Sequence, residues 1–430
     1  MLTNARRTWL IIAALIIFSA AAVFLVPEHR DRAGARAEAV LGLIGQDVLS
    51  VGNDTLEPVS SELKAKWKRY TVSPGTEGSI LITDMDQAVI VLPGDVSGTC
   101  ITVFSGEKEV FSGDAEQFAG FYPENGIYRM EASCTVESMT VTSKGEKLNV
   151  IGTELFKAQL EYAIPLKINF LYDHTKQGSV IPVTASGVRG EVIISAGKLA
   201  APFPLVADSR GYAKGLFSIS YSTDPGSYTA VIESEEGTQE FHFTVEEEQY
   251  TVQHLIISEE TQSSTIGNSD NRAAYNTMMQ STYESWYPGR FYDDCFTQPV
   301  EGTVTTEFGL KRYTNDSPVP SRHAGVDIAN AEGTPVLAAA SGFVIVADYN
   351  GVSGNTVVID HGLGVRSYYF HMSQLNVKKG EFVDEGSEIG QVGSTGYATG
   401  PHLHFNIMVH DNSIDPWAAF NGTSGIFGID

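Results

Sequence analysis

The chain contains 430 residues and carries a formal net charge of −24 at pH 7, from 52 Asp and Glu against 28 Lys and Arg. That length is too great for a single hydrophobic core, so we expect two to four domains. The excess of acidic residues disfavours nucleic acid as a partner, because a polyanion would be repelled. Its plainest consequence is solubility.

An apolar stretch near the start predicts a membrane-spanning segment. Trp9–Val26 is apolar apart from Ser19, and its roughly 18 residues at ~1.5 Å each would span about 27 Å, close to the thickness of a bilayer core. We assign residues 1–26 to an uncleaved signal-anchor transmembrane segment, with a signal peptide cleaved near Ser19–Ala22 as the alternative. The charged, Ala-rich sequence that follows leads us to assign residues 27–67 to a stalk.

Two β-rich stretches come next, which we assign to domains at residues 68–148 and 160–250. In each, short apolar runs alternate with turn residues at near-regular intervals, which predicts a small β-sandwich. The first domain contains no catalytic constellation, and its role as a spacer or a partner-binding domain stays open. In the second, the run Pro225–Thr229 resembles the last hairpin of bacterial immunoglobulin-like modules.

The cysteines give one structural hypothesis. Cys100 and Cys134 fall in predicted strands of the first β domain. In an oxidising compartment a disulfide between them is reasonable, and the alternative is two buried thiols. Cys295 is left over, and we interpret it as an ordinary buried or surface residue.

Residues 251–290 connect the second β domain to the last part of the chain. Residues 256–270 are polar and predict a linker, whereas Asn271–Tyr287 has helical character, with Met278 and Tyr283 among its expected contacts. We expect this helix either to pack on the following domain or to cover its cleft.

Histidine is concentrated near the end of the chain, where residues 323 to 410 contain six of the ten. His402 and His404 form a His-x-His pair in an apolar segment, and the period of two residues in a strand places both rings on one face. His323 and Asp327 lie together upstream, and His371 ends an aromatic run. Two imidazoles and one carboxylate suit a zinc ion and leave a fourth position for water, which is typical of a hydrolytic site.

The segments around these histidines predict β-hairpins, and the Gly-rich Gly393–Pro401 predicts a loop that leads into His402. We therefore assign residues 291–420 to an antiparallel β-sheet domain whose metal site is rimmed by loops. The overall fold class is mostly β. We interpret the other histidines of interest as satisfied or surface groups: His174, His242, His254, His361 and His410.

Residues from about 297 to 418 resemble the lysostaphin-type (LytM-type) zinc metallopeptidases, endopeptidases that cut peptidoglycan. The matching segments occur in the family's order: Thr306–Gly309, His323–Asp327, Gly333–Val336, Tyr369–His371, Gly393–Gly396, Gly400–Phe405 and Asp415–Pro416. The resemblance implies one Zn²⁺ per catalytic domain, held by His323, Asp327 and His404. It implies that His371 and His402 are catalytic histidines that do not bind the metal.

Physical reasoning agrees with those implied roles. Zinc lowers the pKa of bound water from ~15.7 to about 7 and polarises a carbonyl. His402 could then take the proton and pass it to the leaving amine, while His371 hydrogen-bonds the oxyanion. Tyr369, two residues from His371, should face the same side, with aromatic packing as its expected role. Asn406 departs from the family, which often carries an acid there, and we expect an effect on the rim only.

The sequence therefore predicts a membrane-anchored zinc metalloendopeptidase that hydrolyses peptide bonds in peptidoglycan during cell-wall remodelling. The alternative is a weak or inactive peptidase-like protein that binds the wall and activates another hydrolase. We expect a single-pass protein of the cell membrane with its catalytic domain on the extracytoplasmic side, because the inferred substrate lies there. Other envelope proteins could bind through the β domains.

Overall fold

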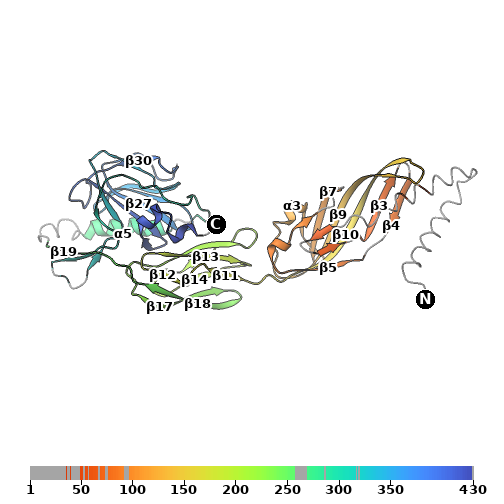
Figure 1. Cartoon of the computed structure of the whole chain (residues 1–430), viewed down its shortest axis with the longest axis horizontal. Coiled ribbons are helices and arrows are strands. Elements are labelled where there is room, and N and C mark those ends of the chain that lie inside the picture. Colours follow the sequence, from red (N-terminus) through yellow and green to blue (C-terminus); the bar gives the residue numbers. More distant parts are fainter. Residues whose placement is uncertain are drawn as a thin grey trace, which may run out of the picture. The chain divides into compact units, whose positions relative to one another are not determined.

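A computed structural model describes most of the chain beyond its first 48 residues (Figure 1). The described residues are Ala35, Ala39, 49–51, 54–56, 58–65, 68–72, 76–91, 96–256, 269–284, 287–315, 317 and 320–428. The predicted signal-anchor at residues 1–26 lies outside them. Within them, no helix combines the length and the apolar character needed to span a bilayer. The chain divides into two compact units. The first ends at Pro165, and the second begins at Leu166.

The described strands of the first unit form two sheets. The small one has the strand order β2-β1-β6, and the large one has the order β4-β3-β10-β9-β7-β8 with β5 paired to β10. Their strands are β1 Leu49–Val51, β2 Asp54–Leu56, β3 Ser60–Ala65, β4 Lys68–Val72, β5 Gly78–Ile82, β6 Ile90–Val91, β7 Val96–Ser105, β8 Lys108–Gly113, β9 Gly126–Val141 and β10 Lys147–Tyr162. A 3-10 helix, Met85–Gln87, and α3, Ala115–Phe118, complete it.

This unit is longer than the predicted domain at both ends. Residues assigned to the stalk form β1, β2 and β3. β3 pairs with the middle of β10 and so belongs to the large sheet. β10 itself runs past residue 148, where we ended the domain, because it pairs with β9 along its whole length. Alternate residues of β9 are buried, from Met130 to Val136, as expected of a strand with one face on a core.

The expected disulfide between Cys100 and Cys134 is wrong, because both cysteines are free. The register of the sheet explains this. β7 and β9 are neighbours, but Cys134 pairs with Thr99, and Cys100 pairs with Ser133. Directly paired residues share a face, so an offset of one residue sends the two thiols to opposite faces. Cys134 is buried and Cys100 is exposed, so the alternative of two buried thiols is also wrong for Cys100.

The second unit begins with a two-sheet β domain around a core that includes Phe203, Phe217 and Phe243. Its sheets have the orders β11-β13-β16 and β12-β18-β17-β14-β15. The strands are β11 Lys167–Phe170, β12 His174–Lys176, β13 Val180–Ser186, β14 Ile193–Ser195, β15 Phe203–Pro204, β16 Ala213–Ser218, β17 Gly226–Ser234 and β18 Gly237–Glu246. The run resembling a last hairpin opens β17, which pairs tightly with β18.

The domain that carries the histidines is built on an eight-stranded sheet of order β20-β23-β31-β27-β26-β25-β29, with β32 paired to β31. Its strands are β20 Thr303–Thr306, β23 Val326–Ala329, β25 Gly342–Asn350, β26 Gly354–Asp360, β27 Val365–Met372, β29 Phe382–Val383, β31 His402–Val409 and β32 Asn412–Ile414. A smaller sheet is formed by β24 Pro335–Leu337, β30 Glu388–Gln391 and β28 Gln374–Leu375. The prediction of a mostly β chain with several sheets is confirmed.

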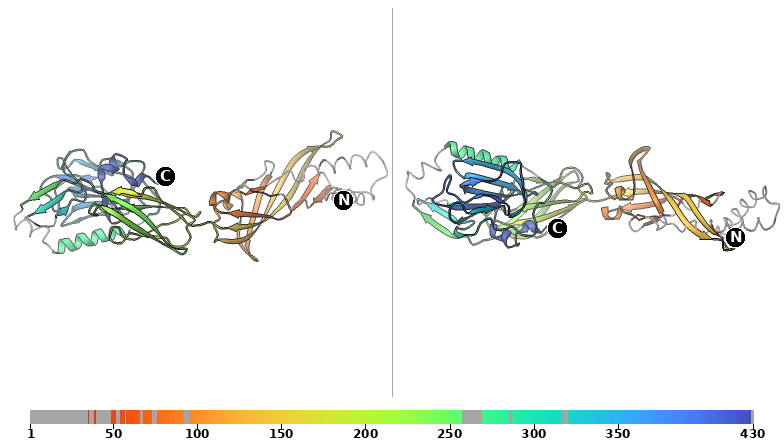
Figure 2. Two further views of the ribbon diagram at one scale, coloured as in Figure 1. Left: turned by 60° about the horizontal axis from the view of Figure 1, so that its bottom comes forward. Right: turned by 90° about the horizontal axis from the view of Figure 1, so that it is seen from above.

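The two faces of this sheet have different neighbours. Leu403, Phe405 and Ile407 of β31 point into the main core of the domain. On the other face, Tyr368 and Phe370 pack against α5, Ser269–Tyr283, which lies along the sheet (Figure 2). The helix predicted at residues 271–287 therefore packs on the domain, on the same face as His402 and His404.

Three further strands lie beside the first histidine of the set. β19, Val252–Leu255, leaves the preceding β domain and pairs in parallel with β21, Lys311–Thr314. β21 in turn pairs with β22, Ser321–Arg322, which leads directly into His323. The last elements among the described residues are α6, Pro416–Phe420, and a 3-10 helix, Gly425–Phe427.

Candidate metal centre

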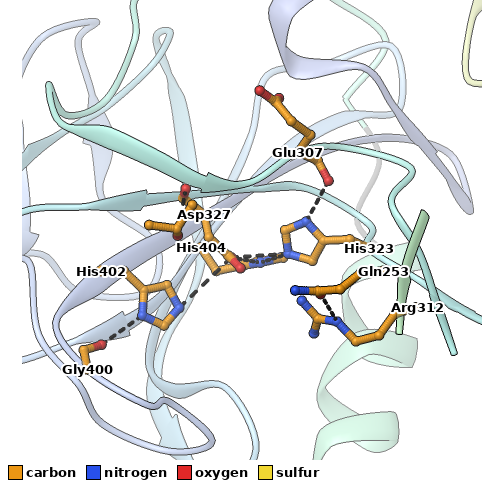
Figure 3. Close-up of polar contacts among 9 residues, drawn as sticks. Gln253, Glu307, Arg312, His323, Asp327, Gly400, His402 and His404 are labelled. Carbon is orange, nitrogen blue, oxygen red and sulfur yellow. Dashed lines mark hydrogen bonds and ion pairs between the residues drawn. The ribbon is translucent and has the colours of Figure 1, made fainter. Parts of the chain in front are cut away.

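Three predicted side chains meet at the junction of β23 and β31. Asp327 pairs directly with His404 across the two strands, so both side chains share one face of the sheet. His323 reaches the same point from the loop after β22. The Nε2 of His323 lies 3.1 Å from Asp327 Oδ1 and 3.0 Å from His404 Nδ1, and the last two atoms are 2.8 Å apart (Figure 3).

This group fits a zinc ion. Zinc bonds of about 2.0–2.1 Å in a tetrahedron place neighbouring ligand atoms about 3.3 Å apart, near the spacing found here. Two imidazole nitrogens and one carboxylate oxygen are ligands that zinc prefers, and three protein ligands leave a position open. The three side chains are 12–15% exposed, so the group is shielded but still accessible. Among the described residues, it is the group identified as able to hold a metal ion.

The ring orientation of His323 follows from a backbone contact. Its Nδ1 lies 3.0 Å from the carbonyl oxygen of Glu307, which only accepts hydrogen bonds (Figure 3). The proton of the neutral ring therefore sits on Nδ1, and the Nε2 lone pair points at Asp327 and His404. Such contacts behind a metal ligand set its tautomer and orientation. The sequence motif includes Glu307, but nothing in it indicates that the backbone carbonyl of Glu307 would accept a hydrogen bond from His323.

The carboxylate of Asp327 is held in its charged form. Burial alone would raise its pKa, but with no metal bound, His323 and His404 donate to it and add positive charge when they are protonated, so its pKa falls well below the ordinary value. Burial lowers the pKa of His404, which favours the neutral ring that a metal needs. Phe370 stacks on the His404 ring at 5.3 Å and 11°.

The other two predicted histidines stand beside this group. The ring of His371 lies 4.9 Å from that of His402 and 6.3 Å from that of His404. His402 Nδ1 donates to Gly400 O at 2.8 Å, and His371 Nδ1 donates to Thr395 O at 2.9 Å. These contacts turn the Nε2 atom of each ring away from the loop, and the Nε2 of His402 lies 3.9 Å from Asp327 Oδ1. The loop predicted at 393–401 supplies both carbonyls, a role that the glycine pattern alone did not reveal.

The backbone at His371 departs from a regular strand. Its φ is 63°, the left-handed region that a non-glycine residue rarely adopts. Strand alternation therefore fails at this point, and the expectation that Tyr369 faces the same side as His371 is wrong. Tyr369 is fully buried in the core, where its hydroxyl accepts from Ala339 N at 2.8 Å, so its expected packing role is confirmed. Unusual backbone of this kind concentrates at functional sites.

The environment of His371 favours its neutral form. Burial, followed by the neighbouring charge of His404, lowers the pKa of His371 to about 4. A neutral ring that donates from Nδ1 can accept a proton on Nε2 but cannot donate one there. His371 can therefore donate to an oxyanion only after it has gained a proton.

Two smaller expectations also meet the structure. Asn406 does not lie on the rim of the site, since it is only 4% exposed and sits within the sheet, paired with Tyr368. The strand period explains this, because Asn406 follows His404 by two residues toward the middle of β31. His361 is buried, His410 is half-buried, and both are hydrogen-bonded, as expected of satisfied groups.

The comparisons with known proteins agree with this geometry. A family model, peptidase family M23, matches residues 321–416. Peptidoglycan DD-endopeptidase ShyB of Vibrio cholerae is 33% identical over 169 residues, which cover 36% of this chain and 39% of that protein. ShyA of the same organism, also a peptidoglycan DD-endopeptidase, is 32% identical over 165 residues, 36% of this chain and 38% of that protein. The chain thus spans less than two fifths of each of these relatives.

A solved structure is also similar to part of this chain. The catalytic domain of the antimicrobial peptidase lysostaphin from Staphylococcus simulans is 35% identical and covers 28% of this chain and 92% of that one, with a TM-score of 0.26. The sheet and its histidines match a metallopeptidase domain. Residues 321–416 form a domain of peptidase family M23. Zinc, the cofactor predicted from the sequence, is the metal of that family and suits the three ligands.

Proposed function

We propose that this protein is a zinc metalloendopeptidase that hydrolyses peptide bonds in peptidoglycan during cell-wall remodelling. The observation that carries the proposal is the meeting of His323, Asp327 and His404 beside two further histidines, His371 and His402. The two Vibrio cholerae relatives, named as peptidoglycan DD-endopeptidases, favour the cross-link between stem peptides as the bond to test first.

The proposed chemistry assigns a role to each residue. Zinc held by His323, Asp327 and His404 would supply Lewis acidity to a water molecule and to the scissile carbonyl. The Nε2 of His402 accepts the proton of the attacking water and later delivers it to the leaving amine. His371 lies within the same pocket of rings and, once it carries a proton, donates a hydrogen bond to the oxyanion.

The test uses the purified full chain and isolated sacculi. We expect muropeptides with cut cross-links to be released, identified by mass, and we expect none from the His404→Ala variant. An exposed histidine of the preceding β domain provides the matched control, since His242→Ala should leave the activity unchanged. Intact sacculi with a zinc-loaded wild type would contradict the proposal and favour a non-hydrolytic wall-binding protein.

We extend the proposal to the membrane on the basis of the apolar stretch Trp9–Val26. The chain would be anchored by this segment, with the catalytic domain on the extracytoplasmic side, where peptidoglycan lies. Membrane fractionation of the full chain and of a chain starting at residue 27 tests this directly. Release of the shorter chain from the membrane fraction is the expected result, and equal retention of both would contradict the anchor.

A further inference from the structure

Two tyrosines of the β domain that precedes the metallopeptidase domain lie against the segment that carries His323. Arg322, the residue just before it, donates from Nη1 to the backbone carbonyl of Tyr221 at 3.1 Å. Its guanidinium lies 5.5 Å from the ring centroid of Tyr250 and 6.0 Å from that of Tyr221. Both distances are within reach of a cation–π interaction.

The second support of His323 rests on the same two rings. The carbonyl that accepts from His323 Nδ1 belongs to Glu307, and the next residue, Phe308, is buried. Phe308 packs edge-on against Tyr221, with centroids 5.3 Å apart, and against Tyr250 at 6.0 Å. Displacement of either ring would therefore disturb the segment that sets the tautomer of His323.

The backbone of His323 is braced at the same place. Its N–H donates to Leu310 O at 3.1 Å, and its carbonyl accepts from Gly309 N at 2.8 Å. Gly309 has a φ of 72°, and a Cβ there would lie 2.2 Å from the ring of Tyr250. Only glycine fits so close to that ring, so Tyr250 is in direct contact with the segment whose backbone is hydrogen-bonded to His323.

Tyr250 is itself held by its own domain. Its hydroxyl donates to the carbonyl of Gln177 at 2.9 Å, and the next residue, Thr251, accepts from Lys311 N at 2.9 Å. The tyrosine thus joins the β domain to the support of one predicted metal ligand.

We propose that Tyr250, together with Tyr221, is a positioning residue of the metal site, which acts on His323 through Arg322, Phe308 and Gly309. The preceding β domain then contributes to the metal centre by holding the ligand His323 in position. This inference rests on the proposed function, because it takes His323 to be a zinc ligand.

The test measures zinc affinity of the full chain by competition with a chromophoric chelator. Tyr250→Leu, which removes the ring, should weaken zinc binding about 10- to 100-fold, the usual range for residues behind a metal ligand. Tyr250→Phe keeps the ring and should stay within about threefold of wild type. Arg322→Gln removes the cation from both rings and should weaken binding in the same direction, which covers the case in which Tyr250→Leu does not fold.

The matched control is Tyr228, a partly buried tyrosine of the same domain whose hydroxyl donates to Asp224 O and whose ring packs on Phe243. Tyr228→Leu should lower the melting temperature and leave zinc affinity unchanged. Unchanged affinity in folded Tyr250→Leu or in Arg322→Gln would overturn the inference, as would an equal loss in Tyr228→Leu. A wild type that binds zinc tightly but leaves sacculi intact would refute the proposed function alone, whereas one that binds no zinc would refute both.

Discussion

Two parts of the site, His371 with His402 on one side and His323 on the other, are held in position by different contacts. His371 and His402 lean on the carbonyls of Thr395 and Gly400, which belong to one loop of the metallopeptidase domain. His323 leans on Glu307 and on contacts that reach back to the preceding β domain. One half is therefore self-contained, and the other depends on residues far away in the sequence.

This difference shows that two things must be distinguished: which residue types form the site, and which contacts hold their side chains in position. Identity is a matter of residue type and spacing, which the printed sequence contains. Support comes from backbone carbonyls and packed rings, which any residue type can supply. Variants that act on metal binding, on proton transfer or on support alone should consequently give distinguishable results.

The largest effect is expected for the three ligand residues. Replacement of His323, Asp327 or His404 by Ala leaves two ligands, which hold zinc poorly, so affinity should fall more than about 100-fold and activity should disappear. Elemental analysis of the purified full chain after dialysis checks this. Full zinc content in the His404→Ala variant would contradict the ligand assignment.

The self-contained half should give a different result. His371→Ala and His402→Ala should keep their zinc and lose turnover by about 10²- to 10⁴-fold, the usual contribution of general acid–base catalysis. Steady-state rates on a cross-linked muropeptide, measured beside zinc content, separate the two effects. Loss of metal in either variant would make that histidine a ligand, and near-normal rates in both would remove them from the chemistry.

The residue types of the candidate site could be predicted, because the proposed chemistry requires particular side chains. Imidazole and carboxylate at fixed spacing cannot be replaced by other side chains, and the strand period alone places His402 and His404 on one face. The left-handed backbone of His371 was not predictable, since nothing in its residue type demands it. The roles remain predictions until variants are measured, although the structure brings all five side chains together.

The fold was predictable to a similar degree. Alternating apolar residues indicated most strands, but pairing depends on contacts distant in sequence, so the extent of β10 and its pairing with β3 were missed. A one-residue offset in register was enough to separate Cys100 from Cys134. The predicted domain at residues 68–148 is therefore shorter than the set of paired strands to which it belongs.

A smaller effect is expected for the pH dependence of folding stability. It involves one histidine inside the metallopeptidase domain and one at its contact with the preceding β domain. Burial lowers the pKa of His361 and of His410 to about 4, and His410 donates to the carbonyl of Leu216 in the β domain. Below about pH 6.5 the unfolded chain takes up protons that the folded chain does not, so stability should fall as pH drops from about 6.5 to 4. The slope is roughly 1.4 kcal/mol per pH unit for each histidine.

Urea unfolding of the full chain with zinc chelated checks this, because metal release then adds nothing to the pH dependence. His410→Asn suits the test, since asparagine tolerates the positive φ of 56° at that position. We expect this variant to show a shallower loss of stability between pH 6 and pH 5. An unchanged slope would show that His410 already takes up its proton in the folded chain.

The smallest effect on activity is expected from α5, which lies on the site face of the sheet but supports neither half directly. Thr282 Oγ1 lies 2.8 Å from the hydroxyl of the fully buried Tyr368. Thr282→Val removes a partner of that hydroxyl and should cost about 1–3 kcal/mol of stability, with rates within about twofold of wild type. Adding Tyr368→Phe removes the other polar group, so the double variant should recover most of the loss. Unfolding curves and rates on one muropeptide measure both quantities. A higher rate in the destabilised variant would instead indicate that the helix restrains the site, whereas an unchanged rate leaves α5 as part of the domain's core.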